Sequence, residues 1–286
     1  MNSKITEKQA EILLAAVIIA RSCAYLFSKI CLNTMRPFFL LASRSLIAFL
    51  LLIILFRKKM SAIKKEELIA GGIIGALFYF VMAAELCGLK TTDSSVAALL
   101  ENTAIVFVPF INASFIRKPP GVKSVFCCIS ALIGIGFITY NGVSVTLSYG
   151  EWLVLLAAVL YALTIVVTSK VSNNGDAINI GTVQVGVIGT LALISSFIFE
   201  TISLPSNNSE IFSLMFLAII CTLFGFTLQP LAQSKCSTEK AGLMCALNPV
   251  TAVVLGVLIL NEPFGIADII GFILIIIAII IYSKSK

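Results

Sequence analysis

The chain is a succession of apolar stretches separated by short polar breaks. A membrane core needs about 20 helical residues to cross it, and apolar stretches of about this length recur along the whole sequence. The breaks carry turn residues or charge, as in RKKMSAIKKEE at 57–67 and SNNGD at 172–176. The pattern predicts ten membrane spans, at about 10–32, 36–56, 68–88, 93–116, 124–142, 151–170, 177–199, 210–231, 240–260 and 265–283.

The composition excludes a soluble protein. Hydrophobic residues make up 59% of the 286 residues and the mean hydropathy is +1.07. Charged residues make up only 12%, against about 25% in an average soluble domain. We therefore expect an all-α integral membrane protein.

The chain lacks the usual side chains of metal and cofactor sites. Histidine, the commonest metal ligand and general base, is absent. The eight cysteines show neither metal-type nor disulfide-type spacing. We expect no metal, no cofactor, no nucleic-acid partner and no enzymatic activity.

The distribution of Lys and Arg among the loops predicts the orientation in the membrane. If both termini are cytoplasmic, the outer loops contain only Arg36 and Lys90. The cytoplasmic segments then contain Lys4, Lys8, Arg57, Lys58, Lys59, Lys64, Lys65, Arg117, Lys118, Lys123, Lys170, Lys235, Lys240, Lys284 and Lys286. This asymmetry predicts a multi-pass protein of the cytoplasmic (inner) membrane with both termini inside.

The two halves of the chain resemble each other. LLAAV occurs at 13–17 and again at 155–159, and KTTDSSVAALLEN at 90–102 matches the spacing of CSTEKAGLMCALN at 236–248. The offset is about half the chain. We predict two repeats, 1–145 and 146–286, of five spans each. An odd number of spans inverts one repeat relative to the other, as in many secondary transporters.

The most specific motif is ALNPVTAVVLGVLILNEPFGIADIIGFILI at 246–275, with an Asn-Pro, a Glu-Pro loop and a following Gly. PFFLLASR at 37–44, GLKTTDSSVAALL at 88–100 and GEWLVLLAAVLYAL at 150–163 accompany it. On these residues the chain resembles the drug/metabolite transporter superfamily, in its ten-helix EamA-like branch. The resemblance implies a 5+5 inverted arrangement, a central cavity open alternately to each side, and substrates such as amino acids and other small metabolites.

The chain departs from this branch at two places. Members usually carry Trp-Gly in the middle of the first span, where this chain has Arg21 and Ser22. The acidic residue usual at the end of the fourth span is replaced by RKPP at 117–120. The first departure alters the expected cavity, and the second affects loop packing.

Charged side chains within the spans are the main functional signal. They are Arg21, Lys29, Arg44, Glu85 and Glu101, and each costs about 2.5–3.5 kcal/mol at a bilayer centre. We expect Lys29 and Glu85 near the outer boundary, where they serve as interfacial anchors and pair with each other. The other three belong deeper in the membrane.

We predict a substrate cavity lined by Arg21, Tyr25, Arg44, Tyr79, Glu101, Tyr161, Gln184 and Asn248. Arg21, Tyr25 and Lys29 share one helix face because they are spaced by four. The within-span cations outnumber the anions by one, so a substrate carboxylate would balance the charge while Glu101 receives an ammonium group. The alternative is that Arg21, Arg44 and Glu101 form a buried ion-pair cluster that only joins helices.

Three functions fit the sequence to different degrees. The first is a secondary transporter that moves a small polar metabolite, zwitterionic or anionic, by alternating access. No nucleotide-binding motif is present, so we expect energy from a gradient, and coupling to protons or another ion stays open. The alternatives are a flippase for a lipid-linked metabolite and, with little to favour it, a membrane-embedded enzyme.

Overall fold

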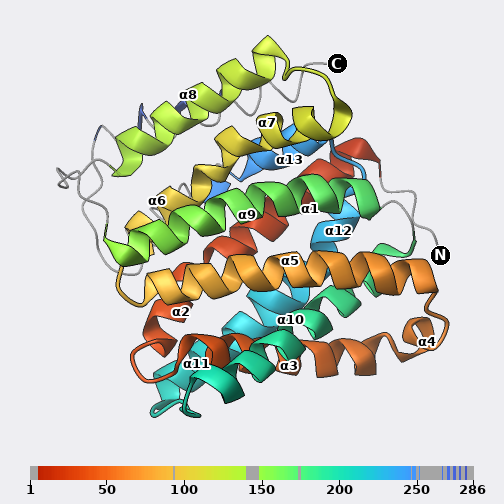
Figure 1. Ribbon diagram of the computed structural model, residues 1–286, viewed down its shortest axis with the longest axis vertical. Helices are drawn as coiled ribbons and strands as arrows, with labels where there is room; N and C mark the ends of the chain where they lie inside the picture. The colour runs from red at the N-terminus through yellow and green to blue at the C-terminus, as the bar shows by residue number, and fades with distance from the viewer. Residues whose placement is uncertain are drawn as a thin grey trace.

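The computed structural model describes residues 6–92, 94–139, 148–172, 175–245 and 247–248, together with isolated positions between 251 and 281. All regular structure in this part of the chain is helical (Figure 1). The helices are α1 Glu7–Ser22, α2 Ala24–Cys31, α3 Pro37–Leu55, α4 Arg57–Met60, α5 Lys65–Leu89, α6 Ser94–Asn102, α7 Ala104–Ile116, α8 Val122–Thr139, α9 Tyr149–Val171, α10 Ala177–Phe199, α11 Asn208–Phe216, the π-helix Leu217–Phe226, α12 Thr227–Gln233 and α13 Thr238–Met244.

The described helices follow the first eight predicted spans. Among the described residues, 6 continuous or composite helices are long and apolar enough to cross a membrane, and Leu100–Ile116 forms a shorter apolar helix. Helix α13 begins the predicted span 240–260. The rest of that span, the Glu-Pro loop and most of the predicted span 265–283 lie outside the described residues. The membrane class is confirmed, and the count of ten stays a prediction.

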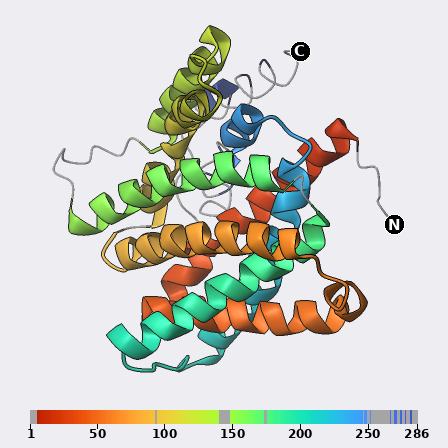
Figure 2. The same ribbon diagram turned by 45° about the vertical axis from the view of Figure 1, so that its right-hand side comes forward.

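The centre of the bundle joins the first half of the chain to the second. Helix α5 packs against both α9 and α10, and α10 also packs along α3 (Figures 1 and 2). Glycine allows the closest of these approaches. A Cβ atom at Gly71 would lie 2.6 Å from the Cβ of Val183, and one at Gly75 would lie 2.8 Å from the carbonyl oxygen of Gln184. This small-xxx-small pair therefore packs helix on helix, as its spacing predicts.

Three of the predicted spans are interrupted helices. The first breaks at Cys23, where the hydroxyl of Ser22 donates to the carbonyl of Ile18, and such side-chain bonds compete with the helix backbone. The fourth breaks at Thr103, whose hydroxyl donates to the carbonyl of Leu100. The eighth changes from α to π geometry over Leu217–Phe226. Interrupted helices within a membrane are tolerated where they line a cavity or are buried in protein.

The basic loops gather at one end of the bundle. The helices run back and forth so that the α3–α5, α7–α8, α9–α10 and α12–α13 connections lie on the right in Figure 1. We call this the basic end, because these connections contain or adjoin the Lys and Arg residues at 57–65, 117–123, 170, 235 and 240. The α2–α3 and α10–α11 connections lie at the opposite end.

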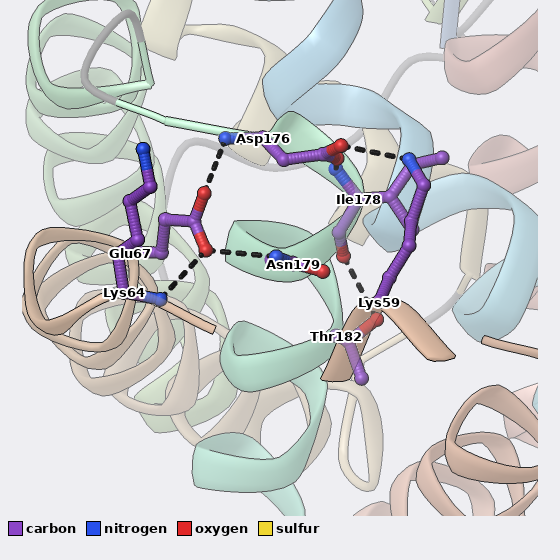
Figure 3. Close-up of polar contacts among 7 residues, drawn as sticks. All are labelled: Lys59, Lys64, Glu67, Asp176, Ile178, Asn179 and Thr182. Atoms are coloured by element: carbon purple, nitrogen blue, oxygen red, sulfur yellow. Dashed lines mark hydrogen bonds and ion pairs between the residues drawn. The ribbon is translucent and has the colours of Figure 1, made fainter. Parts of the chain in front are cut away.

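A polar tie joins the two halves at the basic end (Figure 3). The carboxylate of Glu67, on α5, accepts hydrogen bonds of 2.7 Å from the backbone N–H of Asp176 and from the side chain of Asn179. Asp176 caps α10 by accepting from the N–H of Ile178, and it forms an ion pair of 2.7 Å with Lys59. Partial burial by itself would raise the pKa of Asp176, but these hydrogen bonds hold the pKa below its usual value.

We predict that Asp176→Asn costs less stability than Asp176→Ala. Asparagine keeps the helix cap and loses only the half-exposed ion pair, which contributes less than about 1 kcal/mol. Alanine also loses the cap, at a further cost of about 1 kcal/mol. Thermal unfolding in detergent measures both changes.

The pH dependence separates the ion pair from the cap. Because the folded-state pKa of Asp176 is depressed, the ion pair contributes fully above the unfolded-state value of about 3.9. This contribution is lost as the pH falls through the lower, folded-state pKa. The difference between wild type and Asp176→Asn should be equal at pH 7 and pH 5. An asparagine variant as unstable as the alanine variant would show that the ion pair, and not the cap, dominates.

Candidate functional site

A small polar cavity lies within the bundle, where the interrupted first, fourth and eighth spans meet α3, α5 and α9. It brings together most of the residues predicted from sequence: Arg21, Tyr25, Arg44, Glu101, Tyr161 and Asn248. Ile18, Ala24, Met82, Glu85 and Phe226 complete the lining. Its free volume is about 20 Å³, room for about one water molecule. The space enclosed by the described residues is thus too small for a metabolite, and we call this form closed.

Arg21 is held by neutral partners. Its Nη1 donates to the hydroxyl of Tyr161 at 2.9 Å and to Oε1 of Gln229 at 2.8 Å. The guanidinium carbon lies 4.2 Å from the ring centroid of Phe226 and 5.2 Å from that of Phe78. Aromatic faces stabilise a desolvated cation, by about 2 kcal/mol in favourable cases. These contacts therefore orient Arg21, and no carboxylate of the described residues neutralises its charge through an ion pair.

The π-helix makes room for Arg21. Gly225 lies next to the arginine stem, and a Cβ atom at this position would be 2.8 Å from Cγ of Arg21. Phe226, whose ring faces the guanidinium, is the last residue of the same π-helix. π-Helical turns are rare and frequently occur at functional sites.

Arg44 is the least satisfied charge in the described structure. The residue is 1% exposed, and its Nε and Nη1 atoms have no hydrogen-bond partner among the described residues. Nη2 lies 3.8 Å from the sulfur of Met82, a weak acceptor. No carboxylate of the described residues forms an ion pair with Arg44 or with Arg21. Since an uncompensated buried charge costs several kcal/mol, these donors point to a polar group that enters the cavity.

Two carboxylates face the arginines. Glu101 lies near the end of α6, just before the helix break, and accepts a hydrogen bond from the hydroxyl of Tyr25. Glu85, on α5, is 7% exposed and accepts no hydrogen bond from the described residues. The cavity therefore combines two arginines and two glutamates, and no ion pair joins them among the described residues.

The expected pairing of Lys29 with Glu85 is wrong. The ammonium group of Lys29 donates to the carbonyls of Leu89 and Thr92, at 2.8 and 2.7 Å, and so binds the end of α5. Glu85 instead lines the cavity. Because Lys29 is not a cavity residue, the described lining contains as many arginines as glutamates, two of each, and not an excess of basic residues.

Asn248 and Tyr161 link the second half of the chain to the cavity. Oδ1 of Asn248 accepts a hydrogen bond of 2.5 Å from the hydroxyl of Ser22. The hydroxyl of Tyr161 accepts from Arg21 and from the thiol of Cys245, the latter at 3.5 Å. Both halves thus contribute polar groups to one site.

Tyr79 and Gln184 lie outside the cavity. The hydroxyl of Tyr79 shares a hydrogen bond of 2.5 Å with that of Ser195 on α10. Gln184 is fully buried on α10, and its side-chain amide has no partner among the described residues. Both belong to the region where α10 packs against its neighbours.

Comparison with known proteins gives the family. The model of the EamA-like transporter family matches the chain twice, over residues 8–140 and 148–284. The chain belongs to the EamA-like transporter family. It is therefore a multi-pass membrane transporter.

EamA-like relatives and a solved structure resemble the chain over most of its length. The uncharacterized transporter YoaV of Bacillus subtilis is 26% identical over 208 residues, 71% of this chain and 68% of the relative. An uncharacterized transporter of Archaeoglobus fulgidus is 24% identical over 298 residues, 100% of this chain and 99% of the relative. A crystal structure that covers 96% of both chains matches with a TM-score of 0.80 at 15% identity, a likeness of fold alone.

Sequence reasoning missed several cavity residues of this EamA-like chain. Glu85 lines the cavity and is not only an interfacial anchor, and its spacing from Phe78 and Met82 puts all three on one face of α5. Phe226 is an apolar residue in an apolar run, so the sequence does not mark it as a cavity residue. Only the π-helix brings its ring to Arg21. Gln229 stands out as polar within a span, but its role as a partner of Arg21 depends on tertiary contact.

We predict that Gly225→Ala displaces Arg21 and destabilises the closed form. The added methyl group meets the arginine stem and forces either Arg21 or the π-helix to move. Thermal unfolding in detergent should show a loss of about 1–3 kcal/mol, typical of overpacking.

Gly72→Ala is the matched control, because a Cβ atom at Gly72 meets nothing within 4 Å. This substitution should be neutral or slightly stabilising, since alanine favours a helix more than glycine does. Equal melting temperatures for the two variants would contradict the packing of Arg21 against Gly225.

Proposed function

We propose that this EamA-like protein is a secondary transporter for a small zwitterionic metabolite of the amino-acid class. The observation that carries the proposal is the set of two arginines and two glutamates around one cavity, without an ion pair between them. A structural cluster would bring opposite charges into contact, because contact offsets the cost of burial. Separated charges suit a ligand that carries both signs.

The geometry of the donors favours a carboxylate at the arginines. The planar guanidinium of Arg44 has two nitrogen atoms without a partner, and its fork matches the two oxygens of a carboxylate. Glu85 has no donor among the described residues, and it offers an acceptor for an ammonium group. With two arginines and two glutamates around the cavity, a zwitterion offers a partner to residues of both kinds.

Alternating access accounts for the closed cavity. We propose that the two halves, 1–145 and 146–286, form inverted repeats that move against each other around the cavity. The double match of the family model and the interrupted spans at the cavity support this arrangement. Opening toward one side would enlarge the cavity enough to admit the substrate, and closing would return the form described here.

The experiment is a binding screen with analogues that lack one charge. Purified protein is heated in the presence of amino acids, their methyl esters, their N-acetyl derivatives, simple amines and organic acids. A ligand at 100 times its Kd stabilises the folded state by about 2.7 kcal/mol. We expect stabilisation by one group of free amino acids and a loss of the effect when either charge is blocked.

Substitutions of cavity residues test whether the ligands found in the screen bind in the cavity. Arg44→Gln, Glu85→Gln and Glu101→Gln should each weaken binding at least tenfold, about 1.4 kcal/mol. Tyr79→Phe is the control, since Tyr79 lies outside the cavity. If Glu101 instead carries a coupled proton, Glu101→Gln binds normally but loses the pH dependence of transport.

Three outcomes would contradict the zwitterion proposal. Stabilisation by organic acids alone would indicate an anion transporter, and stabilisation only by lipid-linked compounds would indicate a flippase. If the Arg44, Glu85 and Glu101 variants bind amino acids as tightly as the wild type does, these residues only join helices and do not bind the substrate.

We also propose that the basic end faces the cytoplasm, in the inner membrane, because Lys and Arg concentrate there. Single cysteines introduced at Ser61 and Gly121, in a cysteine-free background, should be protected from an impermeant thiol reagent in intact cells. A cysteine at Asn207, at the opposite end, should react. Labelling at Ser61 together with protection at Asn207 would invert the proposed orientation.

A further inference from the structure

A second pocket, separate from the central cavity, opens at the basic end. It has a free volume of about 550 Å³ and lies between the α3–α5 connection and the start of α10. Its charged and polar lining consists of Lys58, Lys59, Lys64, Glu67, Asp176 and Asn179. The pocket is large enough for a phosphate-bearing headgroup.

The two acidic residues of this pocket are already engaged. Glu67 accepts hydrogen bonds from the backbone N–H groups of Asp176 and Lys64 and from the side chain of Asn179 (Figure 3). Asp176 accepts from Lys59 and from the N–H of Ile178. Their carboxylate oxygens therefore face donors of the protein and offer little to a cation from outside.

The basic residues are less engaged. Lys59 alone of the pocket lysines forms an ion pair within the described structure. The contact drawn to Lys64 in Figure 3 reaches its backbone nitrogen and not its ammonium group. Lys58 and Lys64 are exposed, and Arg57 and Lys65 adjoin them in sequence. The available donors of the pocket are thus cationic, which favours an anionic ligand.

Exposed apolar residues lie close in sequence to the pocket lysines. Ile54 and Leu55, at the end of α3, are 72% and 65% exposed, and Leu68 and Ile69, in the first turns of α5, are 47% and 52% exposed. These side chains flank the basic segment on both sides along the chain. In a membrane transporter, this change from lipid-facing to charged residues marks the level of the lipid headgroups.

We propose that the pocket binds the headgroup phosphate of an anionic phospholipid, with Lys58 and Lys64 as its ligands and the acyl chains along the exposed apolar residues of α3 and α5. We favour a lipid over free phosphate because exposed apolar residues precede and follow the basic segment along the chain. A bound lipid would lie beside the Lys59–Asp176 ion pair and so support the tie between the two halves of the chain. The proposal does not depend on the identity of the transported substrate.

The test measures the binding of different lipids to the wild type and to two double variants that each lose two positive charges. Purified protein in a zwitterionic detergent is titrated with short-chain phosphatidylglycerol, phosphatidylcholine and inorganic phosphate, and binding is followed by native mass spectrometry. We expect saturable binding of phosphatidylglycerol only. Lys58→Gln with Lys64→Gln should weaken this binding at least tenfold, whereas Lys118→Gln with Lys123→Gln should change it less than twofold.

The control pair removes the same charge from exposed positions at the same end of the bundle. Lys58→Arg with Lys64→Arg should keep the binding, which shows that loss in the glutamine variant is not misfolding. Equal weakening by the two glutamine pairs would overturn the proposal in favour of general surface charge. Binding of inorganic phosphate as tight as that of phosphatidylglycerol would overturn the choice of a lipid.

Discussion

The arrangement of the bundle depends on how it encloses two guanidinium groups. A buried cation without a carboxylate partner is costly in any low-dielectric interior, and lipid offers it nothing. The protein meets this constraint differently at the two arginines. Arg21 is surrounded by aromatic faces, a tyrosine hydroxyl and a glutamine amide, whereas Arg44 keeps two donors without a partner. The first guanidinium group is held in place, and the second is the one that we propose to bind the substrate.

The interrupted helices follow from the same constraint. A continuous α-helix offers only side chains to a cavity, while a break or a π-turn changes the direction of the chain and widens the space between neighbours. The break at Cys23 lies beside Arg21, the break at Thr103 follows Glu101, and the π-helix carries both Gly225 and Phe226. Irregular backbone is thus concentrated where the charges are, in line with its restriction to cavities and protein interiors in membranes.

The two ends of the bundle complement this centre. At the basic end, Glu67 and Asp176 connect α5 to α10 through hydrogen bonds and one ion pair. At the opposite end, Glu210 accepts from the hydroxyl of Thr34, and the carboxylate of Glu200 accepts from the N–H groups of Phe38 and Phe39. Each of these contacts joins the first half of the chain to the second. Polar contacts between residues far apart in the chain therefore lie at both ends of the bundle, on either side of the cavity.

The sequence by itself determined the membrane class, the positions of the helices that follow the first eight predicted spans, and the polar residues that make up about half of the cavity lining. These follow from local properties: an apolar run of sufficient length must cross the bilayer, and a charge such as Arg21 or Glu101 deep in such a run must face inward. Only the tertiary structure decided which inward-facing groups meet. It placed Glu85 in the cavity and Lys29 on the end of α5, and it left Tyr79 and Gln184 outside. The sequence predicts the depth of a residue within a span to about one helical turn. The rotation of each helix and the helices that it packs against depend on contacts between residues far apart in the chain.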